Sequence, residues 1–539
     1  MRFVRRAAVC LVLLLAALVG ARAQSLAQLR PRFIFGAHQK AASQLPNTHG
    51  FENYVSSGKL RLTLEDAIRL ALANNTQILM DQSQVDIAKD SVRRAHSPFD
   101  VLLSSQFSDQ RTVSPQYSQL NSSNSLTQTT LASIGETLET GTIYDVSFSA
   151  NKYSSNNAFN IFNPAISTGL SFQLTQPLLR NAGWFVNRAP IVIAQRTLGE
   201  SRANFEAEVN DTVLQVIEQY WAVVEARQNL VVQRESLDQA QRTYEHDKHS
   251  LDLGALAPPD IHRSEAQVAA RKLSVIQTQY SLTQMEDQFR RFIGADVDPA
   301  IRALDLDLAE MPEPIGTLTT ADLQASIQKA LSYRPEMESI RLQLLNDDTS
   351  VKLAHNSLEP DLSVRGDYTT NGLNAIAAGG VTSPGSFGDA VDQMLGFGFP
   401  TYGFTVSLSV PIKNHAAEAN LGDALVAKRR DLYTERNERE VVTLDVTNAV
   451  HQLEESKASM DAAKAALNFA RQTLQSDQHK YDLGAGDVFF VLDDQTQVAQ
   501  SELGLLQAQV NYQIAVTSVQ HATGTLLDQY RVQFQQLTK

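Results

Sequence analysis

The sequence predicts a mainly α-helical fold that also contains a membrane β-barrel, built from two tandem repeats of one unit. Three observations predict it: an internal duplication, segments in which apolar and small polar residues alternate, and long helices with heptad patterning. The duplication consists of similar stretches in the same order in both halves: 92–96 and 351–355 at an offset of 259, then 252–255 and 482–485, and 267–269 and 497–499, at an offset of 230. Because the offset falls by about thirty residues, the first half contains an insertion between residues 100 and 177.

The composition disfavours several classes of protein. The chain has 539 residues, with 46 basic and 59 acidic side chains and a formal net charge of -13. A nucleic-acid-binding protein needs a basic face, which this balance does not suggest. A mean hydropathy of -0.22 argues against a helical membrane protein. A membrane span would therefore have to be a β-barrel, since only helices and closed barrels satisfy their backbone groups in lipid.

The first 23 residues have the pattern of an export signal. Three arginines within the first six residues precede an apolar run over 7–20, and residues 21–23 offer a small-x-small cleavage pattern. We expect the mature chain to begin at Gln24 and to carry no cysteine, because Cys10 is the single cysteine and lies in this segment. The protein is therefore expected to be exported from a bacterial cytoplasm and to lack disulfide and thiol chemistry.

Each repeat is expected to open with a helix. In the first half, Thr63 and Asp66 have the spacing of a capping box, and apolar residues continue at helical spacing to about His96. The matching helix of the second half is expected from about Thr320 to about Asn356.

Strands are expected to follow each opening helix. Apolar residues alternate with Ser, Thr, Gly or Gln over 402–410, 170–175 and 144–149, and less regularly over 101–108. About nine to eleven residues of this alternation suit a barrel strand with lipid on one side and a watery lumen on the other, although a half-buried strand of a soluble sheet has the same pattern. Prolines mark the expected joints between strand and helix: Pro98, Pro177, Pro360 and Pro411.

Long helices follow the strands. One apolar column steps by three and four residues along the second half and has a counterpart in the first: Val446, Ala449, Leu453, Ser456, Met460, Ala463, Leu467, Ala470 and Leu474, and Val216, Val223, Leu230, Leu237 and Tyr244. A second apolar row predicts neighbours on both sides, as in a ring of helices: Ala458, Ala462, Ala465 and Phe469. A helix over 187–250 would be about 100 Å long at the usual rise per residue. Tight reversals are expected at Gly254, Gly484 and Gly486.

These features resemble the outer-membrane efflux protein family, the TolC-like exit ducts of Gram-negative bacteria. The resemblance covers about 60–527 and rests on the duplicated Leu-Gly-Ala reversals, on 481–484 leading into 491–493, and on 63–67 and 176–181. It implies a TolC-like trimer in which each chain gives four strands to a twelve-stranded barrel and four long helical segments to a tunnel across the periplasm. The extra segment over 127–155 either joins that barrel or forms an external loop.

The resemblance also implies a division of the chain and a function. The division is a signal peptide over 1–23, an extended arm over 24–59, a first efflux repeat over 60–293, an equatorial linker over 294–319, a second repeat over 320–527 and a tail over 528–539. The function is that of an outer-membrane exit duct in a tripartite efflux or type I secretion system. It would conduct substrates passively from an inner-membrane pump, with a periplasmic adaptor as a further partner.

In such a duct the periplasmic ends of the helical hairpins close the tunnel. The resemblance places Asp260, Tyr481 and Asp493 at this constriction, where one Asp repeated three times makes a negative ring that attracts cations. This chain has Gly486 where some relatives have an Arg, and Phe490 where some have an acid. We therefore expect Phe490 to form a hydrophobic collar, with Asp487 and Asp494 as nearby substitutes for the missing acid. A helix N-cap is an equally good interpretation of Asp260 and Asp487, since each follows a glycine turn.

Enzyme readings of the sequence find little support. No phosphate-binding loop, His-Glu-x-x-His or Gly-x-Ser-x-Gly motif is present in the sequence. His246 and His249 share a helix face near Asp252, but solvated polar side chains explain them better than a metal site. We expect no enzyme activity, no cofactor and no metal. The alternative function is a periplasmic coiled-coil adaptor, which would explain the hairpins and the signal peptide but not two sets of alternating strands.

Overall fold

The computed structural model describes residues 48–56, 58–115, 122–157, 160–253, 258–314, 318–378, 381–483 and 485–532. The chain divides into two compact units. The first unit holds Asp90–Gln195 and Asn346–Lys428, and the second holds Arg196–Leu345 with the described parts of Gln44–Lys89 and Arg429–Lys539. Each unit therefore combines matching parts of both sequence halves, and neither unit corresponds to one repeat.

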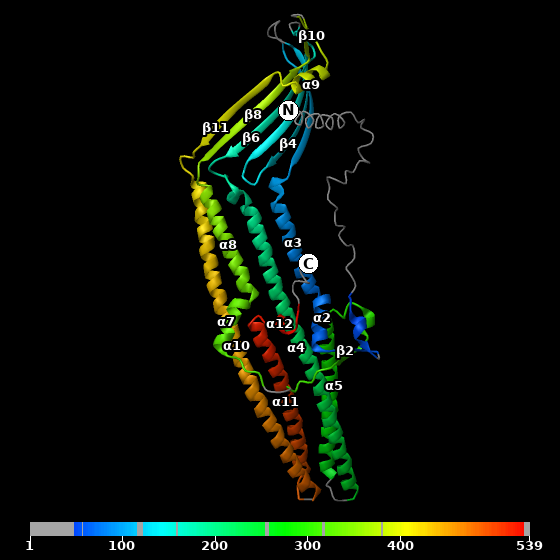
Figure 1. Cartoon of the computed structure of the whole chain (residues 1–539). Helices are drawn as coiled ribbons and strands as arrows, with labels where there is room; N and C mark the ends of the chain where they lie inside the picture. The colour runs from blue at the N-terminus through cyan, green and yellow to red at the C-terminus, as the bar shows by residue number, and fades with distance from the viewer. Residues whose placement is uncertain are drawn as a thin grey trace. The chain divides into compact units, whose positions relative to one another are not determined.

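The first unit is built on one antiparallel sheet of six strands (Figure 1). The strand order is β11-β8-β6-β5-β4-β3, with these bounds: β3 (Leu102–Val113), β4 (Asn124–Thr137), β5 (Ile143–Ser155), β6 (Ala165–Pro177), β8 (Asp361–Leu373) and β11 (Pro400–Ser409). The alternating segments of the sequence lie in β3, β5, β6 and β11. The resemblance implied four strands per chain, and this number is wrong for the described sheet, because segment 127–155 forms β4 and β5 inside it.

The strand register sorts the side chains of this sheet onto two faces, because residues directly opposite in an antiparallel pair share a face. One face, which we call the apolar face, runs across all six strands through Leu408, Leu362, Tyr368, Phe172, Val146, Ile134 and Leu103. The opposite, polar face carries one row of hydroxyls from edge to edge: Thr401, Thr369, Ser171, Ser147, Ser133 and Ser104. The alternation seen in the sequence is thus continuous around the whole sheet.

A short helix covers part of the apolar face. After the hairpin β9 (Ala375–Ala378) and β10 (Val381–Pro384), α9 (Phe387–Leu395) begins with a capping box between Ser386 and Asp389. Thr168 Oγ1 donates to the carbonyl of Ala390 at 2.9 Å, and Thr370 Oγ1 donates to the carbonyl of Met394 at 2.7 Å. Gly372 is needed here because a Cβ at this position would collide with the Ala390 carbonyl.

Four long helices form two hairpins: α4 (Trp184–Asp252) with α5 (Pro258–Phe292), and α10 (His415–Asp482) with α11 (Val488–Ala522). The column predicted from heptads faces inward, since Val446, Leu453 and Leu467 are buried. The second row is exposed in the single chain, at Ala458, Ala462, Ala465 and Phe469. One side of α10 is thus packed within the chain, whereas the apolar row on the opposite side of α10 is left uncovered.

The opening helix of each repeat is interrupted, so the expectation of continuous helices is wrong. The first half has α2 (Leu64–Asn74) and α3 (Thr76–Ala95), and the second has α7 (Leu323–Tyr333) and α8 (Pro335–Asn356). Asn75 (ψ 122°) and Arg334 (ψ 132°) are extended at the breaks. Pro335 disfavours a helical conformation at Arg334, and the Asn75 side chain accepts from the N–H of Gln77 at 2.8 Å. The capping box of Thr63 and Asp66 is confirmed.

The arm and the linker meet in the second unit. β1 (Val55–Ser56) of the arm pairs with β2 (Lys59–Leu62), and β2 pairs in parallel with β7 (Asp305–Leu308) of the linker. The other small elements of this unit are η1 (Phe51–Tyr54), α6 (Pro299–Arg302) and α12 (Leu526–Gln529), whereas η2 (Ser97–Phe99) belongs to the first unit. The largest core cluster lies here and includes Leu60, Leu62, Ile68, Tyr220, Phe289 and Leu526. Residues 24–47 of the arm lie outside the described residues. Among the described helices, none is both long and apolar enough to cross a membrane.

Candidate functional site

The predicted constriction residues lie near the hairpin ends of the second unit. Tyr481 lies in the last turn of α10, whereas Phe490 and Asp493 lie in the first two turns of α11. Asp260 lies in the first turn of α5. Gly254 and Gly484 lie outside the described residues, and Gly486 lies in the turn before α11, where a Cβ would come within 2.9 Å of the Tyr481 backbone nitrogen.

A buried carboxylate connects the two hairpins. Asp247, in α4, has no solvent exposure, and its Oδ1 accepts a hydrogen bond from the Tyr481 hydroxyl at 2.6 Å. The hydroxyl of Ser264, in α5, donates to the other carboxylate oxygen of Asp247. His246 Nδ1 lies 3.5 Å from Asp247 Oδ1, and the His246 ring packs edge-on against the Tyr481 ring. Asp247 thus holds α5 of its own hairpin and α10 of the other hairpin at one point.

A second set of polar contacts joins the hairpins close to this point. Gln495, which is buried in α11, donates to the Thr243 hydroxyl of α4 at 3.0 Å. Arg271 of α5 donates to the Thr496 hydroxyl of α11 at 2.5 Å. Polar side chains therefore contribute to the contact between the hairpins in this region, and each such bond can be exchanged for a bond to water when the hairpins separate.

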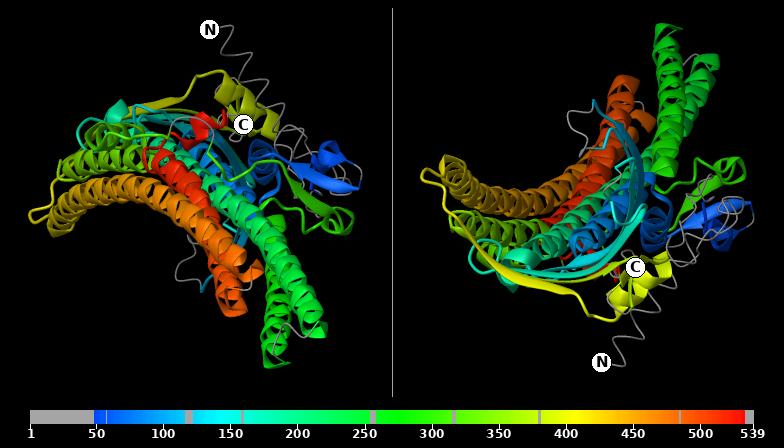
Figure 2. Two further views of the ribbon diagram at one scale, coloured as in Figure 1. Left: turned by 90° about the horizontal axis from the view of Figure 1, so that it is seen from below. Right: turned by 90° about the horizontal axis from the view of Figure 1, so that it is seen from above.

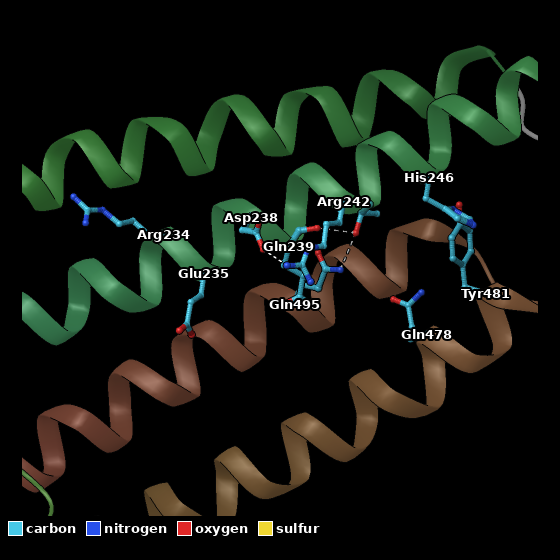
Figure 3. Close-up of a pocket in the computed structure, with 10 residues that line it drawn as sticks. Arg234, Glu235, Asp238, Gln239, Arg242, His246, Gln478, Tyr481 and Gln495 are labelled. Carbon is cyan, nitrogen blue, oxygen red and sulfur yellow. Dashed lines mark hydrogen bonds and ion pairs between the residues drawn. The ribbon is translucent and has the colours of Figure 1, made fainter.

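Tyr481 also borders an open groove between α4 and the second hairpin (Figure 3). The groove has a volume of about 800 Å³ and is lined mostly by charged and amide side chains: Arg234, Glu235, Asp238, Gln239, Arg242, Thr243, His246, Gln478, Tyr481 and Gln495. Arg242 and Asp238 form an ion pair of 2.7 Å along one side of it. Because the open groove borders Tyr481, the Tyr481 side of the bond to Asp247 lies at the margin of the packed region.

Asp487 is a helix N-cap. Its side chain accepts from the backbone N–H of Phe489 at 2.8 Å, so its charge faces the N-terminus of α11. Phe490 is 55% exposed and packs edge-on against Phe489, over whose ring the Arg263 guanidinium lies. Two adjacent aromatic rings are thus exposed at this hairpin end.

The acids of α11 differ in environment. Asp493 is exposed, whereas Oδ2 of Asp494 is buried and meets no hydrogen-bond donor among the described residues. Burial raises the pKa of the Asp494 carboxyl above its ordinary 3.8, and the charges of Asp477 and Asp493 raise it further, while Lys480 opposes them. A hydrogen bond between Asp494 and Asp477 requires a proton on one of the two, which also favours the protonated form.

Sequence reasoning missed Asp247 and Ser264, although the duplication contains the signal. At the offset of 230, Asp247 corresponds to Asp477, and Ser264 corresponds to Asp494. Both hairpins thus place an Asp of the first helix beside a polar residue of the second helix. The first hairpin has a carboxylate and a hydroxyl, which satisfy each other, whereas the second has two carboxylates, which repel each other unless a proton is shared.

This difference yields a stability prediction for Asp494→Ser, which copies the first hairpin's pair. At pH 7.5 the free energy of unfolding of the variant is expected to be about 1 kcal/mol higher than that of wild type, because the substitution removes an unsatisfied buried oxygen. The raised pKa of Asp494 means that the folded wild type binds a proton more tightly than the unfolded chain does. Wild type therefore gains stability as pH falls from above this raised pKa toward the ordinary 3.8. The difference between variant and wild type is therefore expected to shrink at pH 5, as measured by thermal unfolding.

The matched control for this measurement is Asp461→Ser, at an exposed position of α10. Its effect should be within a few tenths of a kcal/mol of zero at both pH values. A difference for Asp494→Ser that is absent at pH 7.5, or that grows on acidification, would contradict the assignment.

The four prolines lie where strands and helices meet in the first unit. Pro98 lies in η2, between α3 and β3, and Pro360 lies between α8 and β8. Pro177 is the last residue of β6, and Pro411 lies between β11 and α10. Backbone bonds cross-link these joints, since Leu178 donates to the carbonyl of Leu362 at 2.8 Å.

Comparison with known proteins identifies relatives of the whole arrangement. The family model described as "Outer membrane efflux protein" matches residues 144–295 and 326–525, together well over half of the chain. The protein named "Outer membrane protein TolC" of Vibrio cholerae serotype O1 is 23% identical over 368 residues, which cover 68% of this chain and 78% of the relative. Its namesake of Escherichia coli K12 is 22% identical over 376 residues, covering 67% and 70%.

Solved structures share the fold at lower identity. The structure titled as the open state of the MtrE outer membrane channel of Neisseria gonorrhoeae matches with a TM-score of 0.60 and 16% identity, over 90% of this chain and 98% of that one. Long helices and a sheet thus combine here as they do in known channels.

Proposed function

Because the chain belongs to the outer membrane efflux protein family, and is therefore an exit duct of the outer membrane, we propose that the ends of its two helical hairpins form the gate of that duct. In this proposal Tyr481 and Asp247 hold the closed state, and Asp493 sets the charge at the opening. The observation that carries it is the 2.6 Å bond between the Tyr481 hydroxyl and the fully buried Asp247 carboxylate, which joins one hairpin to the other.

The closed state is held by few bonds, so it can be released. A hydrogen bond to a charged group contributes about 1.5–3 kcal/mol, and removing its donor leaves the buried carboxylate with one fewer partner. The neighbouring bonds from Gln495 and Arg271 are of the kind that water can replace. The free-energy difference between the closed and the open hairpin ends is therefore small. A partner that binds the hairpin ends more tightly when they are apart can overcome it.

The assembly in this proposal is a trimer that works with a periplasmic adaptor and an inner-membrane pump. Support within the chain comes from the exposed apolar row of α10, at Ala458, Ala462, Ala465 and Phe469, which lies opposite the buried column. A helix with apolar rows on both sides fits a ring in which every helix has two neighbours. The duct conducts passively in either a tripartite efflux or a type I secretion system, and carries out no reaction of its own. The alternative of a periplasmic adaptor does not agree with membership of a channel family.

The charge at the opening gives a direct test. Asp493 is exposed on α11, and three copies of it would make a negative ring that favours cations in a narrow pore. Asp493→Asn is expected to lower the cation-to-anion permeability ratio by about threefold or more, measured as the reversal potential of the purified protein in a planar bilayer under a salt gradient.

The matched control is Asp461→Asn on α10, away from the hairpin ends. It should leave the permeability ratio as in wild type. An unchanged ratio in Asp493→Asn, with a trimer intact by light scattering, would remove Asp493 from the gate while leaving the duct itself unaffected.

A further inference from the structure

The outer edges of the six-stranded sheet have no partner among the described residues. β3 and β11 are the terminal strands, and each pairs with one neighbour only. All 12 residues of β3 and all 10 residues of β11 are exposed. About half of the residues in an antiparallel edge strand turn both their N–H and C=O groups outward, so each edge presents a row of unpaired backbone groups.

These edges cannot remain open in the outer membrane. Each unpaired backbone group in lipid costs several kcal/mol, and the exposed apolar side chains reach both edges, with Phe107 and Leu103 in β3 and Phe404 and Tyr402 in β11. Six strands cannot close on themselves, because the smallest membrane sheets that do so have eight. The edges therefore require a partner, and the sheet is already curved along its strand order (Figure 2).

A second copy of this chain fits the edges by strand direction. Neighbouring strands of the sheet are all antiparallel, and their number is even. The two edge strands consequently run in opposite directions, so β11 of one copy next to β3 of another is again an antiparallel pair. The apolar face and the hydroxyl row then continue from copy to copy without changing sides.

We propose that copies of this chain pair β11 of one with β3 of the next, and that three copies close one sheet of eighteen strands. The total of eighteen strands follows from six strands in each of three copies, and the count of three copies rests on the proposed function. β4 and β5 are interior strands of that sheet, and they contribute to both of its faces. The duct at the membrane is about one and a half times as wide as a twelve-stranded one, since diameter grows roughly linearly with strand number.

The pairing is tested by cysteine cross-linking in a Cys10→Ser background, which leaves no native cysteine. Ser407→Cys on the polar face of β11 is combined in turn with a cysteine at each polar-face position of β3: Leu102, Ser104, Gln106, Ser108, Gln110 and Thr112. Oxidation is expected to give covalent dimers and trimers for one or two adjacent positions, since a disulfide requires Cα atoms within about 7 Å. The control pairs Ser407→Cys with Ser147→Cys in the interior strand β5, and should give single chains.

The outcomes separate this inference from the proposed function. A trimer by light scattering without cross-links in any of the six pairs would overturn the β11–β3 pairing and leave the duct standing. A protein that is not a trimer would instead overturn the assembly on which both rest.

The width is tested by deleting residues 124–155, which removes β4 and β5 and leaves both edge strands unchanged. In a Tyr481→Phe background, where the hairpin ends limit conductance less, the deletion is expected to reduce single-channel conductance to about half, in line with a two-thirds diameter. Unchanged conductance in an intact trimer would contradict the inference. For a deletion variant that does not assemble, electron cryo-microscopy of the full chain decides: eighteen strands in cross-section support the inference, and twelve overturn it.

Discussion

Tyr481→Phe is expected to conduct ions more freely than wild type in planar bilayers, with an open fraction about tenfold to a hundredfold higher. The change removes only the hydroxyl that donates to Asp247 at 2.6 Å. The ring that packs against His246 is kept, so the packing of the hairpin end is preserved. A hydrogen bond to a buried carboxylate is worth about 1.5–3 kcal/mol, and each 1.4 kcal/mol is a factor of ten in an equilibrium.

Two further variants make this result specific. Asp247→Asn keeps an oxygen that accepts from Tyr481 but loses the charge, so its open fraction should lie between those of wild type and Tyr481→Phe. Tyr280→Phe removes a hydroxyl from an exposed tyrosine of α5 and should behave as wild type. Equal conductance of Tyr481→Phe and wild type, with trimers intact, would show that this bond does not hold the gate.

Ala462→Arg is expected to abolish assembly of the trimer. Ala462 lies in the apolar row on the uncovered side of α10 and is exposed in the single chain. If this side faces the next helix of the ring, the substitution buries a long cation without a partner in every copy. Burial of an unpaired charge costs several kcal/mol per site, more than a subunit contact tolerates. The measurement is the mass of the detergent-extracted protein by light scattering.

Ser459→Arg is the matched control for this substitution. Ser459 is a small, exposed residue of the same helix, away from both the buried column and the apolar row. It should assemble as wild type does, which excludes an effect of arginine on the helix itself. Intact trimers of Ala462→Arg would mean that the apolar row is not a contact between copies.

Much of the fold was predictable because it depends on periodicity. Heptad spacing marked the buried column of α10, and alternation marked β5, β6 and β11. The breaks at Asn75 and Arg334 were missed, because a single extended residue leaves the apolar spacing on either side almost intact. At Arg334 the proline that follows was the available signal. The ion pairs of Arg334 with Glu336 at 2.8 Å and with Asp445 at 3.1 Å are visible only in three dimensions.

The sheet shows a different limit of sequence reasoning. The offset between the repeats revealed an insertion of about thirty residues, but neither its length nor its composition says whether it joins a sheet. Membership depends on hydrogen-bond register, which places Val146 opposite Phe172 and Ile134 opposite Val146. The four-strand expectation came from resemblance and not from these residues.

The proposed gate draws only in part on the sequence. Tyr481 was identified by resemblance, but its partner Asp247 lies 234 residues away in the chain and carries no motif. Asp487 illustrates the opposite case, because its capping role follows from local geometry and was weighed from the sequence alone. Contacts that depend on the approach of two hairpins cannot be predicted from the pattern of either one.

The most direct test of the central claim is electron cryo-microscopy of the detergent-extracted wild-type protein at a resolution that shows side chains. A gated duct predicts a threefold assembly whose hairpin ends converge on the axis, with the Tyr481 hydroxyl bonded to Asp247 in every copy. Single copies, or a threefold assembly in which Tyr481 and Asp247 are apart while the hairpin ends close the axis, would contradict it.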